Sequence, residues 1–184
     1  MENIKKSVAA FLVGAAGLFG LNQLPHACGI VPETAMIDLT EQIGDYARGR
    51  VPSFLLVGNG AVALLEVTED NAEEDVARLV RTLDGVFMES VFYDGYEEHG
   101  NKAERRDAEM DEYIAAMLRK PLMAGKQVFA LDYVKGDKIR EVQGLGAAAG
   151  YVADAGDRLL DVIPDRPPMN ENANDVTQLR QGKN

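Results

Sequence analysis

Short apolar runs alternate with amphipathic segments through most of this 184-residue chain, and this alternation limits its fold more than any other feature. In the amphipathic segments, apolar residues recur every three or four positions, which is the spacing of one face of a helix. The runs between them are continuously apolar, as is typical of parallel strands that are covered by helices. The pattern predicts an α/β fold with about four parallel strands and covering helices, either a doubly wound sheet or part of a (β/α) barrel.

The expected elements follow from these periods and form one domain over residues 30–163. Helices are predicted at residues 33–50, 73–83, 102–119 and 137–145, and a last helix is expected to begin within 158–162. Strands are predicted at residues 53–57, 85–93, 127–133 and 150–152. The sequence Gly58-Asn59-Gly60 is typical of a turn and predicts a strand-to-helix connection.

The two ends of the chain differ from this domain. Met1–Lys6 carries two lysines, and Val8–Leu21 contains no charged residue but is short for a bilayer-spanning helix. Residues 1–27 are therefore predicted to be an export signal, with a buried N-terminal helix as the alternative, and the protein is expected to be secreted or periplasmic. The pair Ala27-Cys28 resembles a lipoprotein site, but the proline and histidine before it do not suit lipidation. Residues 164–184, rich in Pro, Asn and Asp, are predicted to be a disordered tail.

Composition excludes several functional classes. The formal net charge is −11, and an acidic surface repels phosphate backbones, so we expect no nucleic-acid partner. The chain has one cysteine and two histidines, which cannot form an internal disulfide or a Cys-rich zinc site. We expect no metal and no cofactor.

Each apolar run leads to a polar residue, namely Asn59, Glu89, Asp132 and Asp154. In barrels and open α/β sheets, the site lies at the carboxyl ends of the strands. Two carboxylates at neighbouring strand ends suit glycoside hydrolysis, in which one gives a proton and the other attacks the sugar or activates water. Because loops in general carry acids, the pattern is also compatible with ordinary strand-to-loop transitions.

Glu89 is the strongest of these candidates. Its neighbours Phe87, Met88 and Phe92 are apolar, and such surroundings favour the neutral form of a carboxyl group. We therefore expect Glu89 to be buried and to point into a hollow large enough for a sugar, close to Asn59 and Asp132.

Four short motifs occur in a recognisable order: DYAR at residues 45–48, FLLVGNG at 54–60, GVFMESVFY at 85–93 and KQVFALDYV at 126–134. In this order they resemble the C-terminal half of the endo-α-1,4-polygalactosaminidase-like glycoside hydrolases, which are exported (β/α)8 barrels of the TIM type. The resemblance covers about residues 35–163. It implies a partial (β/α)8 barrel that acts on an α-linked, galactosamine-type polysaccharide.

The resemblance also implies roles for single residues. Glu89 matches one of the two catalytic carboxylates, a general acid/base, and Asn59 matches a residue that lines the pocket. Asp132 and Tyr133 match an acid–tyrosine pair at a strand end, so Asp132 is the internal candidate for a second catalytic acid. Tyr93 and Tyr133 are expected to contact substrate.

Two departures qualify these roles. Gly58 stands where the family has Gln, and residues 28–34 do not supply the earlier strand that carries the other catalytic carboxylate. We therefore expect a truncated half barrel with open strand edges, which a second copy or a partner chain would complete. Little turnover is expected from a single copy. The alternatives are an exported non-catalytic carbohydrate-binding or assembly module, and a degraded gene product that folds poorly.

Overall fold

The computed structural model describes residues 32–97 and 101–159. The predicted export signal, the question of Cys28 lipidation and the predicted tail lie outside the described residues. In chain order the elements are α1 (Pro32–Arg50), β1 (Val57–Asn59), the 3-10 helix η1 (Ala61–Leu65), α2 (Glu73–Thr82), β2 (Gly85–Glu89), β3 (Tyr93–Asp94), β4 (Glu104–Arg105), α3 (Ala108–Met123), β5 (Gln127–Asp132), α4 (Asp137–Ala149) and β6 (Val152–Ala155).

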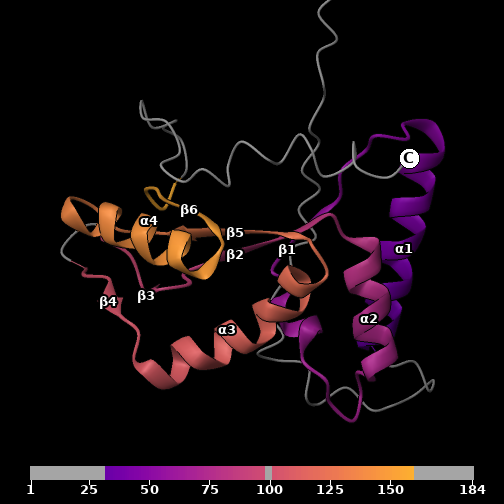
Figure 1. Ribbon diagram of the computed structural model, residues 1–184, viewed down its shortest axis with the longest axis horizontal. Coiled ribbons are helices and arrows are strands. Elements are labelled where there is room, and N and C mark those ends of the chain that lie inside the picture. The colour runs from indigo at the N-terminus through magenta and orange to yellow at the C-terminus, as the bar shows by residue number, and fades with distance from the viewer. Residues whose placement is uncertain (1–31, 98–100, 160–184) are drawn as a thin grey trace, which may run out of the picture.

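A four-stranded parallel sheet in the order β1-β2-β5-β6 forms the centre of the molecule. A second, antiparallel sheet pairs only β3 with β4. In Figure 1, α1 and α2 lie at the β1 end of the main sheet, α4 lies at the β6 end, and α3 lies on one side. The predicted α/β fold with four parallel strands and covering helices is confirmed, and the arrangement is consistent with part of a (β/α)8 barrel.

The two faces of this sheet differ in burial. Val86 pairs with Val128 across β2 and β5, and both are almost fully buried beneath the helices. The next position pairs Phe87 with Phe129, and Phe129 pairs in turn with Val152; all three are only half-buried. Because successive residues of a strand point to opposite faces, the helices cover one face, and the other, here called the open face, is less covered. A doubly wound sheet would carry helices on both faces.

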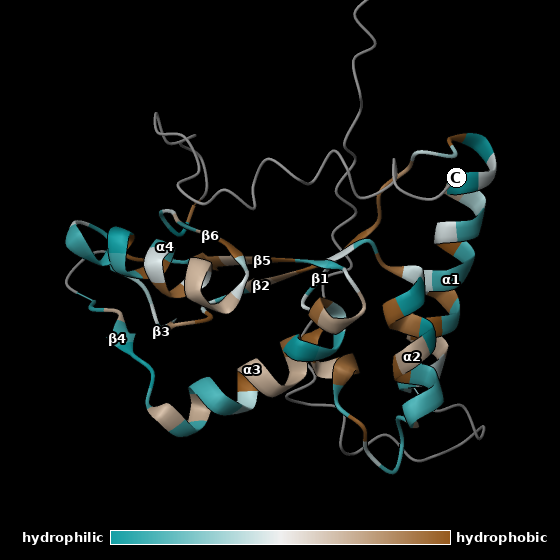
Figure 2. Cartoon of the chain, viewed as in Figure 1, coloured by the Kyte–Doolittle hydropathy of each residue, from teal (hydrophilic) through white to brown (hydrophobic). Residues whose placement is uncertain are grey.

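Hydropathy follows the same layers. Figure 2 shows β2 and β5 mainly in the hydrophobic colour, whereas α1, α2 and α4 mix the two colours along their length. The helices therefore bury one side each, as their apolar spacing predicts. No helix within residues 32–97 and 101–159 is long and apolar enough to cross a membrane.

Ion pairs connect α1 to α2 and to Asp84, which lies between α2 and β2. The Arg78 guanidinium on α2 contacts the carboxylates of Asp38 at 2.5 Å, Glu41 at 2.6 Å and Asp75 at 2.7 Å. At the other end of α1, Arg48 contacts Asp84 at 2.8 Å. The helix flank that faces α2 is therefore held by charge.

α4 lies unusually close to β6. Gly146 faces Ala153, and a Cβ atom added to Gly146 would lie 2.1 Å from the Cβ of Ala153. Only glycine allows this approach, which brings the helix onto the strand.

Several predicted boundaries were wrong. The first strand is Val57–Asn59 and begins where it was expected to end. Gly58 and Asn59 of the predicted turn therefore belong to the strand, and only Gly60, in a left-handed conformation, connects it to η1. The predicted strand 85–93 splits after Glu89 into β2 and β3. The third helix begins only after Asp107, whose carboxylate accepts a hydrogen bond from the Met110 N–H, and it continues through Pro121.

The C-terminal part shifts in the same way. α4 extends to Ala149, so the last strand starts at Val152 instead of residue 150. Of the helix expected within 158–162, only Arg158 and Leu159 are described, and they form a turn.

Candidate functional site

Three predicted site residues come together at the carboxyl ends of neighbouring strands. Glu89 ends β2, and its carboxylate accepts a 2.5 Å hydrogen bond from the Tyr133 hydroxyl, which follows β5. The Asn59 amide, at the end of β1, donates to the other Glu89 oxygen at 3.5 Å, a long contact. The strand register explains the meeting, because Asn59 pairs with Phe87 and Glu89 with Leu131 on one face of the sheet. These three residues are called the Glu89 cluster below.

The expectation that Glu89 is buried was wrong. Its side chain is exposed, because β2 turns it to the open face, whereas the helices cover the other face. Of its apolar neighbours, Phe92 is buried, but Phe87 and Met88 are only half-buried. The carboxylate is therefore accessible from solvent and is held by its two hydrogen-bond donors.

Tyr133 is the better-shielded member of the cluster. Burial raises the pKa of its hydroxyl above the ordinary value of 10, and the hydrogen bond to Glu89 raises that pKa further. The hydroxyl consequently stays protonated through the neutral range and remains a hydrogen-bond donor.

The backbone bends sharply immediately after Glu89. Ser90 has φ 53°, the left-handed region that residues other than glycine rarely occupy. Its N–H donates to the Leu131 carbonyl at 2.7 Å, and its carbonyl accepts from Arg106 Nε at 3.0 Å. Such strained backbone often lies at functional sites. Sequence reasoning gave no role to either residue, although Ser90 lies within the motif GVFMESVFY at residues 85–93; no motif contains Arg106.

Asp132 is not part of the Glu89 cluster. Its side chain is fully buried, and Oδ1 accepts hydrogen bonds from the N–H groups of Phe92 at 2.9 Å and Tyr93 at 2.7 Å. Burial raises the pKa of this carboxyl, although the backbone hydrogen bonds oppose the shift. Asp132 thus holds the segment after β2 in place from beneath the sheet, and the structure does not bring it to Glu89 as a second carboxylate.

Tyr93 also points elsewhere. It is buried, and its hydroxyl donates to Glu141 of α4 at 2.7 Å. The pKa of Tyr93 is raised to about 12, mainly by burial and secondly by this hydrogen bond to Glu141. Asp154 accepts a hydrogen bond from Gln143 of α4 at 3.1 Å. Both side chains therefore connect α4 to the rest of the domain.

An apolar pocket lies beside β1, with Asn59 on its lining. The other lining residues come from α1, β1, η1, α2 and the residues that flank these elements: Met36, Thr40, Leu56, Val57, Gly58, Gly60, Ala61, Ala63, Leu64, Leu79 and Leu83. Glu89 is not among them, so this pocket is not the hollow expected around Glu89. The described residues contain no group of three or more His, Cys, Asp or Glu side chains placed to hold a metal ion.

Comparison with known proteins identifies the fold. No family model matches the sequence. No curated protein matches it either. The structure is similar to that of the glycoside hydrolase domain of PelA from Pseudomonas aeruginosa, with a TM-score of 0.50 and 18% sequence identity. The match covers 71% of this chain and 47% of that one, so this chain spans about half the length of its structural neighbour. The fold is thus glycoside-hydrolase-like.

Proposed function

We propose that this chain is a glycoside-hydrolase-like half barrel in which Glu89 is the general acid/base toward an α-linked, galactosamine-type polysaccharide. One observation carries the proposal. Glu89 ends a parallel strand of a glycoside-hydrolase-like fold, and hydrogen-bond donors from the two neighbouring strand ends reach its two oxygens. This is the edge of the sheet at which barrel enzymes place their catalytic groups.

The chemistry assigned to Glu89 is proton transfer. As an acid it gives its proton to the glycosidic oxygen while the bond from that oxygen to the sugar carbon breaks. As a base it then takes a proton from the water that attacks the same carbon, which restores the acid. Tyr133 and Asn59 hold the carboxylate between these steps. An accessible Glu89 suits a polymer, which must reach the group from solvent.

The acidic surface supports the choice of substrate. The net charge of the chain is −11, and a polysaccharide with free amino groups is a polycation when those groups are protonated. Opposite charges raise the local concentration of the polymer at the protein, and salt weakens this attraction.

Catalysis in this mechanism also needs a second carboxylate, which stabilises or attacks the sugar carbon. Asp132, the internal candidate, is buried beneath the sheet. We therefore expect slow turnover from a single copy. The same observation favours the second candidate function, an exported carbohydrate-binding module that uses the Glu89 cluster without catalysis.

The test uses the purified full chain with α-1,4-linked galactosamine oligosaccharides, with binding measured by calorimetry and hydrolysis by released reducing ends. Glu89→Gln keeps the size of the side chain and removes its proton chemistry. For an enzyme, hydrolysis is lost and binding stays. For a binding module, the wild type binds without hydrolysis. The matched control is Glu109→Gln, an exposed glutamate on α3. Hydrolysis that survives Glu89→Gln contradicts the assigned role, and the absence of both binding and hydrolysis in the wild type contradicts both functions.

Export is part of the proposal and rests on residues 1–27. The test is cell fractionation with the chain expressed with and without those residues. We expect the full chain outside the cytoplasm and the shortened chain inside it, and equal fractions in the cytoplasm would contradict export.

A further inference from the structure

We infer that two copies of this chain assemble into one closed eight-stranded barrel, in which α1 of each copy packs against α4 of the other. The first observation is the set of elements. The described residues form four parallel strands and the helices α1 to α4, whereas a closed barrel of this kind has eight of each. Two copies supply that number.

The order of the elements along the chain determines where α1 would lie in the closed barrel. α2, α3 and α4 each connect one strand of the sheet to the next and cover the seam between them. α1 precedes β1, the outermost strand, so the seam that α1 would cover has only one of its two strands in the described sheet. A twofold arrangement brings β6 of the other copy alongside β1 and completes the seam.

The surface of α1 supports a packed neighbour. Its flank toward α2 is held by the ion pairs of Arg78 and Arg48. The opposite flank carries Leu39 and Tyr46, which are 54% and 64% exposed, with half-buried Ile43 between them. Spacings of four and three residues place these side chains on one helix face. Leu39 and Tyr46 lie two turns apart on a flank that faces away from the helix's own domain, and the Arg50 guanidinium stacks on the Tyr46 ring at 3.5 Å from its centroid. We assign this flank to the contact with α4 of the partner.

The flank of α4 that faces outward has room for a large side chain at Ala147. Lys138 and Glu141 of α4 contact residues of the β3–β4 region, which sets the inner flank of the helix. Gly144 and Ala148 are three and seven residues after Glu141 and lie on its side of the helix, whereas Ala147 is exposed away from those contacts, beside the exposed Arg140. A small residue on one helix leaves space for a large residue of another, and Arg140 borders that space.

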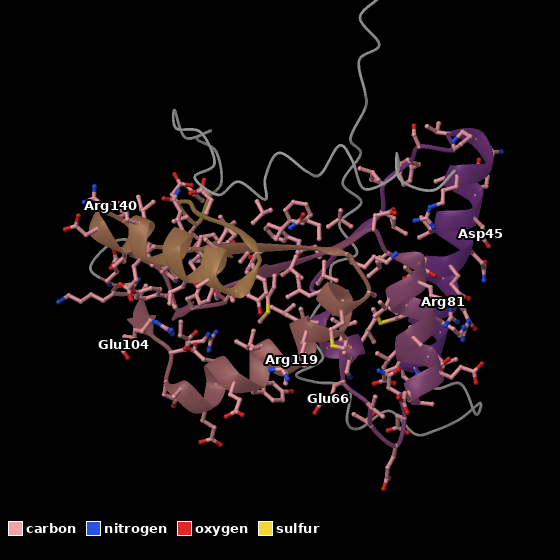
Figure 3. All side chains as sticks on the ribbon, viewed as in Figure 1. Asp45, Glu66, Arg81, Glu104, Arg119 and Arg140 are labelled. Carbon is pink, nitrogen blue, oxygen red and sulfur yellow. The ribbon has the colours of Figure 1, made fainter. Side chains whose placement is uncertain are left out.

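The positions of the two helices fit a twofold dimer. α1 and α4 lie at opposite ends of the molecule in Figure 1, and Figure 3 labels Asp45 on α1 and Arg140 on α4 at those two ends. Each end of one copy then meets the other end of its partner, which gives two identical contacts and a closed assembly.

The side chains of the open face also support a second copy as the partner. Phe87, Phe129, Leu131 and Val152 lie half-buried on it, and in a closed barrel such side chains fill the interior. The length of the structural neighbour favours a second copy as the occupant. The matched part of this chain corresponds to 47% of the neighbour's chain, so two matched parts have about the length of one such domain.

Closing the barrel would also bring a second Glu89 into the site, and the catalytic meaning of this change rests on the proposed function. The Glu89 residues of both copies would lie on one rim, because all strands of the barrel are parallel. The partner's Glu89 is then the second carboxylate that a single copy lacks. The tests below measure assembly alone, so their outcome is independent of activity.

The first test is the mass in solution of the full chain, measured by sedimentation equilibrium from low to tens of micromolar concentration. We expect twice the chain mass of 20.0 kDa. Leu39→Glu with Tyr46→Glu is expected to give a monomer with an unchanged circular dichroism spectrum, because both side chains are exposed within one copy. The matched control is Met123→Glu, at an 82% exposed residue that ends α3, and it should remain a dimer. A monomeric wild type overturns the inference, as does a Leu39/Tyr46 variant that stays dimeric.

The second test separates the closed barrel from other dimers. One preparation carries Tyr46→Cys and another carries Ala147→Cys, both with Cys28→Ser, and a bismaleimide is added to each alone and to their mixture. The helices of a barrel run in the same direction, so Tyr46, near the end of α1, lies close to the level of Ala147 in the last turn of the partner's α4, and the covalent dimer should form in the mixture and not in either preparation alone. Equal cross-linking in the separate preparations, or none in the mixture of a dimeric protein, overturns the proposed arrangement.

Discussion

Glu89 and Asp132 end neighbouring parallel strands, yet their carboxylates lie on opposite faces of the sheet. Glu89 pairs with Leu131, so Asp132, one residue further along β5, must point the other way. The two carboxylates therefore have different roles. Glu89 is exposed with Asn59 and Tyr133 as donors, whereas Asp132 is fully buried and holds the backbone that follows Glu89.

The burial of Asp132 predicts that its contribution to the stability of the fold depends on pH. Burial raises its pKa above 3.8, so the folded state favours the protonated form. The stabilisation from that form is fully present below the unfolded pKa and is lost as pH rises through the raised value. Asp132→Asn fixes a neutral side chain and keeps an oxygen for the Phe92 and Tyr93 N–H groups. Urea unfolding of this variant should therefore show a smaller fall in stability between about pH 4 and about pH 7 than the wild type.

Two further variants check that prediction. Asp132→Ala leaves the two buried N–H groups without their acceptor and should cost about 1–3 kcal/mol at all pH values. Asp45→Asn, at an exposed position of α1, should keep the pH profile of the wild type. If Asp132→Asn follows the wild-type profile, the buried carboxyl is not the titrating group.

The opposite orientation of Glu89 and Asp132 also shows which features of the site could be predicted from the sequence. Helical spacing and apolar runs were sufficient to predict the four strands and the four main helices. They also placed Asn59, Glu89 and Asp132 at strand ends, whereas Asp154 lies within β6. They could not tell which face each strand end presents, because that depends on the register of β2 against β5 and on which face the helices cover. The exposure of Glu89 follows from these long-range facts alone. The contact between Arg106 and the Ser90 carbonyl likewise joins segments that no local pattern connects.

The approach of α4 to β6 predicts an intolerant glycine. Gly146→Ala places a methyl group 2.1 Å from the Ala153 Cβ, and the helix must move away from the strand to admit it. Overpacking of this kind costs about 1–3 kcal/mol, which thermal or urea unfolding measures directly. Gly49→Ala in α1 is the matched control, since nothing lies within 4 Å of its added methyl group, and it should stabilise by up to about 1 kcal/mol. Equal effects at the two glycines would refute the close packing.

The left-handed backbone at Ser90 predicts a graded response to substitution. Glycine accepts φ 53° without a steric penalty, which favours the folded state of Ser90→Gly. Glycine also gives the unfolded chain more backbone freedom, which opposes this gain. The free energy of unfolding of Ser90→Gly should therefore lie within about 1 kcal/mol of the wild-type value. Ser90→Val brings a β-branched side chain to the same backbone and should lose about 1–3 kcal/mol. The comparison is made by urea unfolding at one pH. If the valine variant is as stable as the glycine variant, the bend after Glu89 is not a constrained feature.

Tyr133→Phe tests whether the hydrogen bond to Glu89 serves the site or only the fold. The hydroxyl of Tyr133 stays protonated at neutral pH because burial and Glu89 raise its pKa, so its loss should matter equally across the neutral range. One such bond contributes about 0.5–1.5 kcal/mol, which limits both the loss of stability and the loss of carbohydrate affinity or hydrolysis to about tenfold. Tyr113→Phe is the control, because the Tyr113 hydroxyl donates to Glu66 at 3.0 Å in a more exposed tyrosine–glutamate pair. Tyr133→Phe should lose at least as much stability as Tyr113→Phe, and only Tyr133→Phe should weaken binding or hydrolysis of the oligosaccharides. An equal loss of binding in both variants would show that the hydroxyl at 133 supports the fold, with no special role beside Glu89.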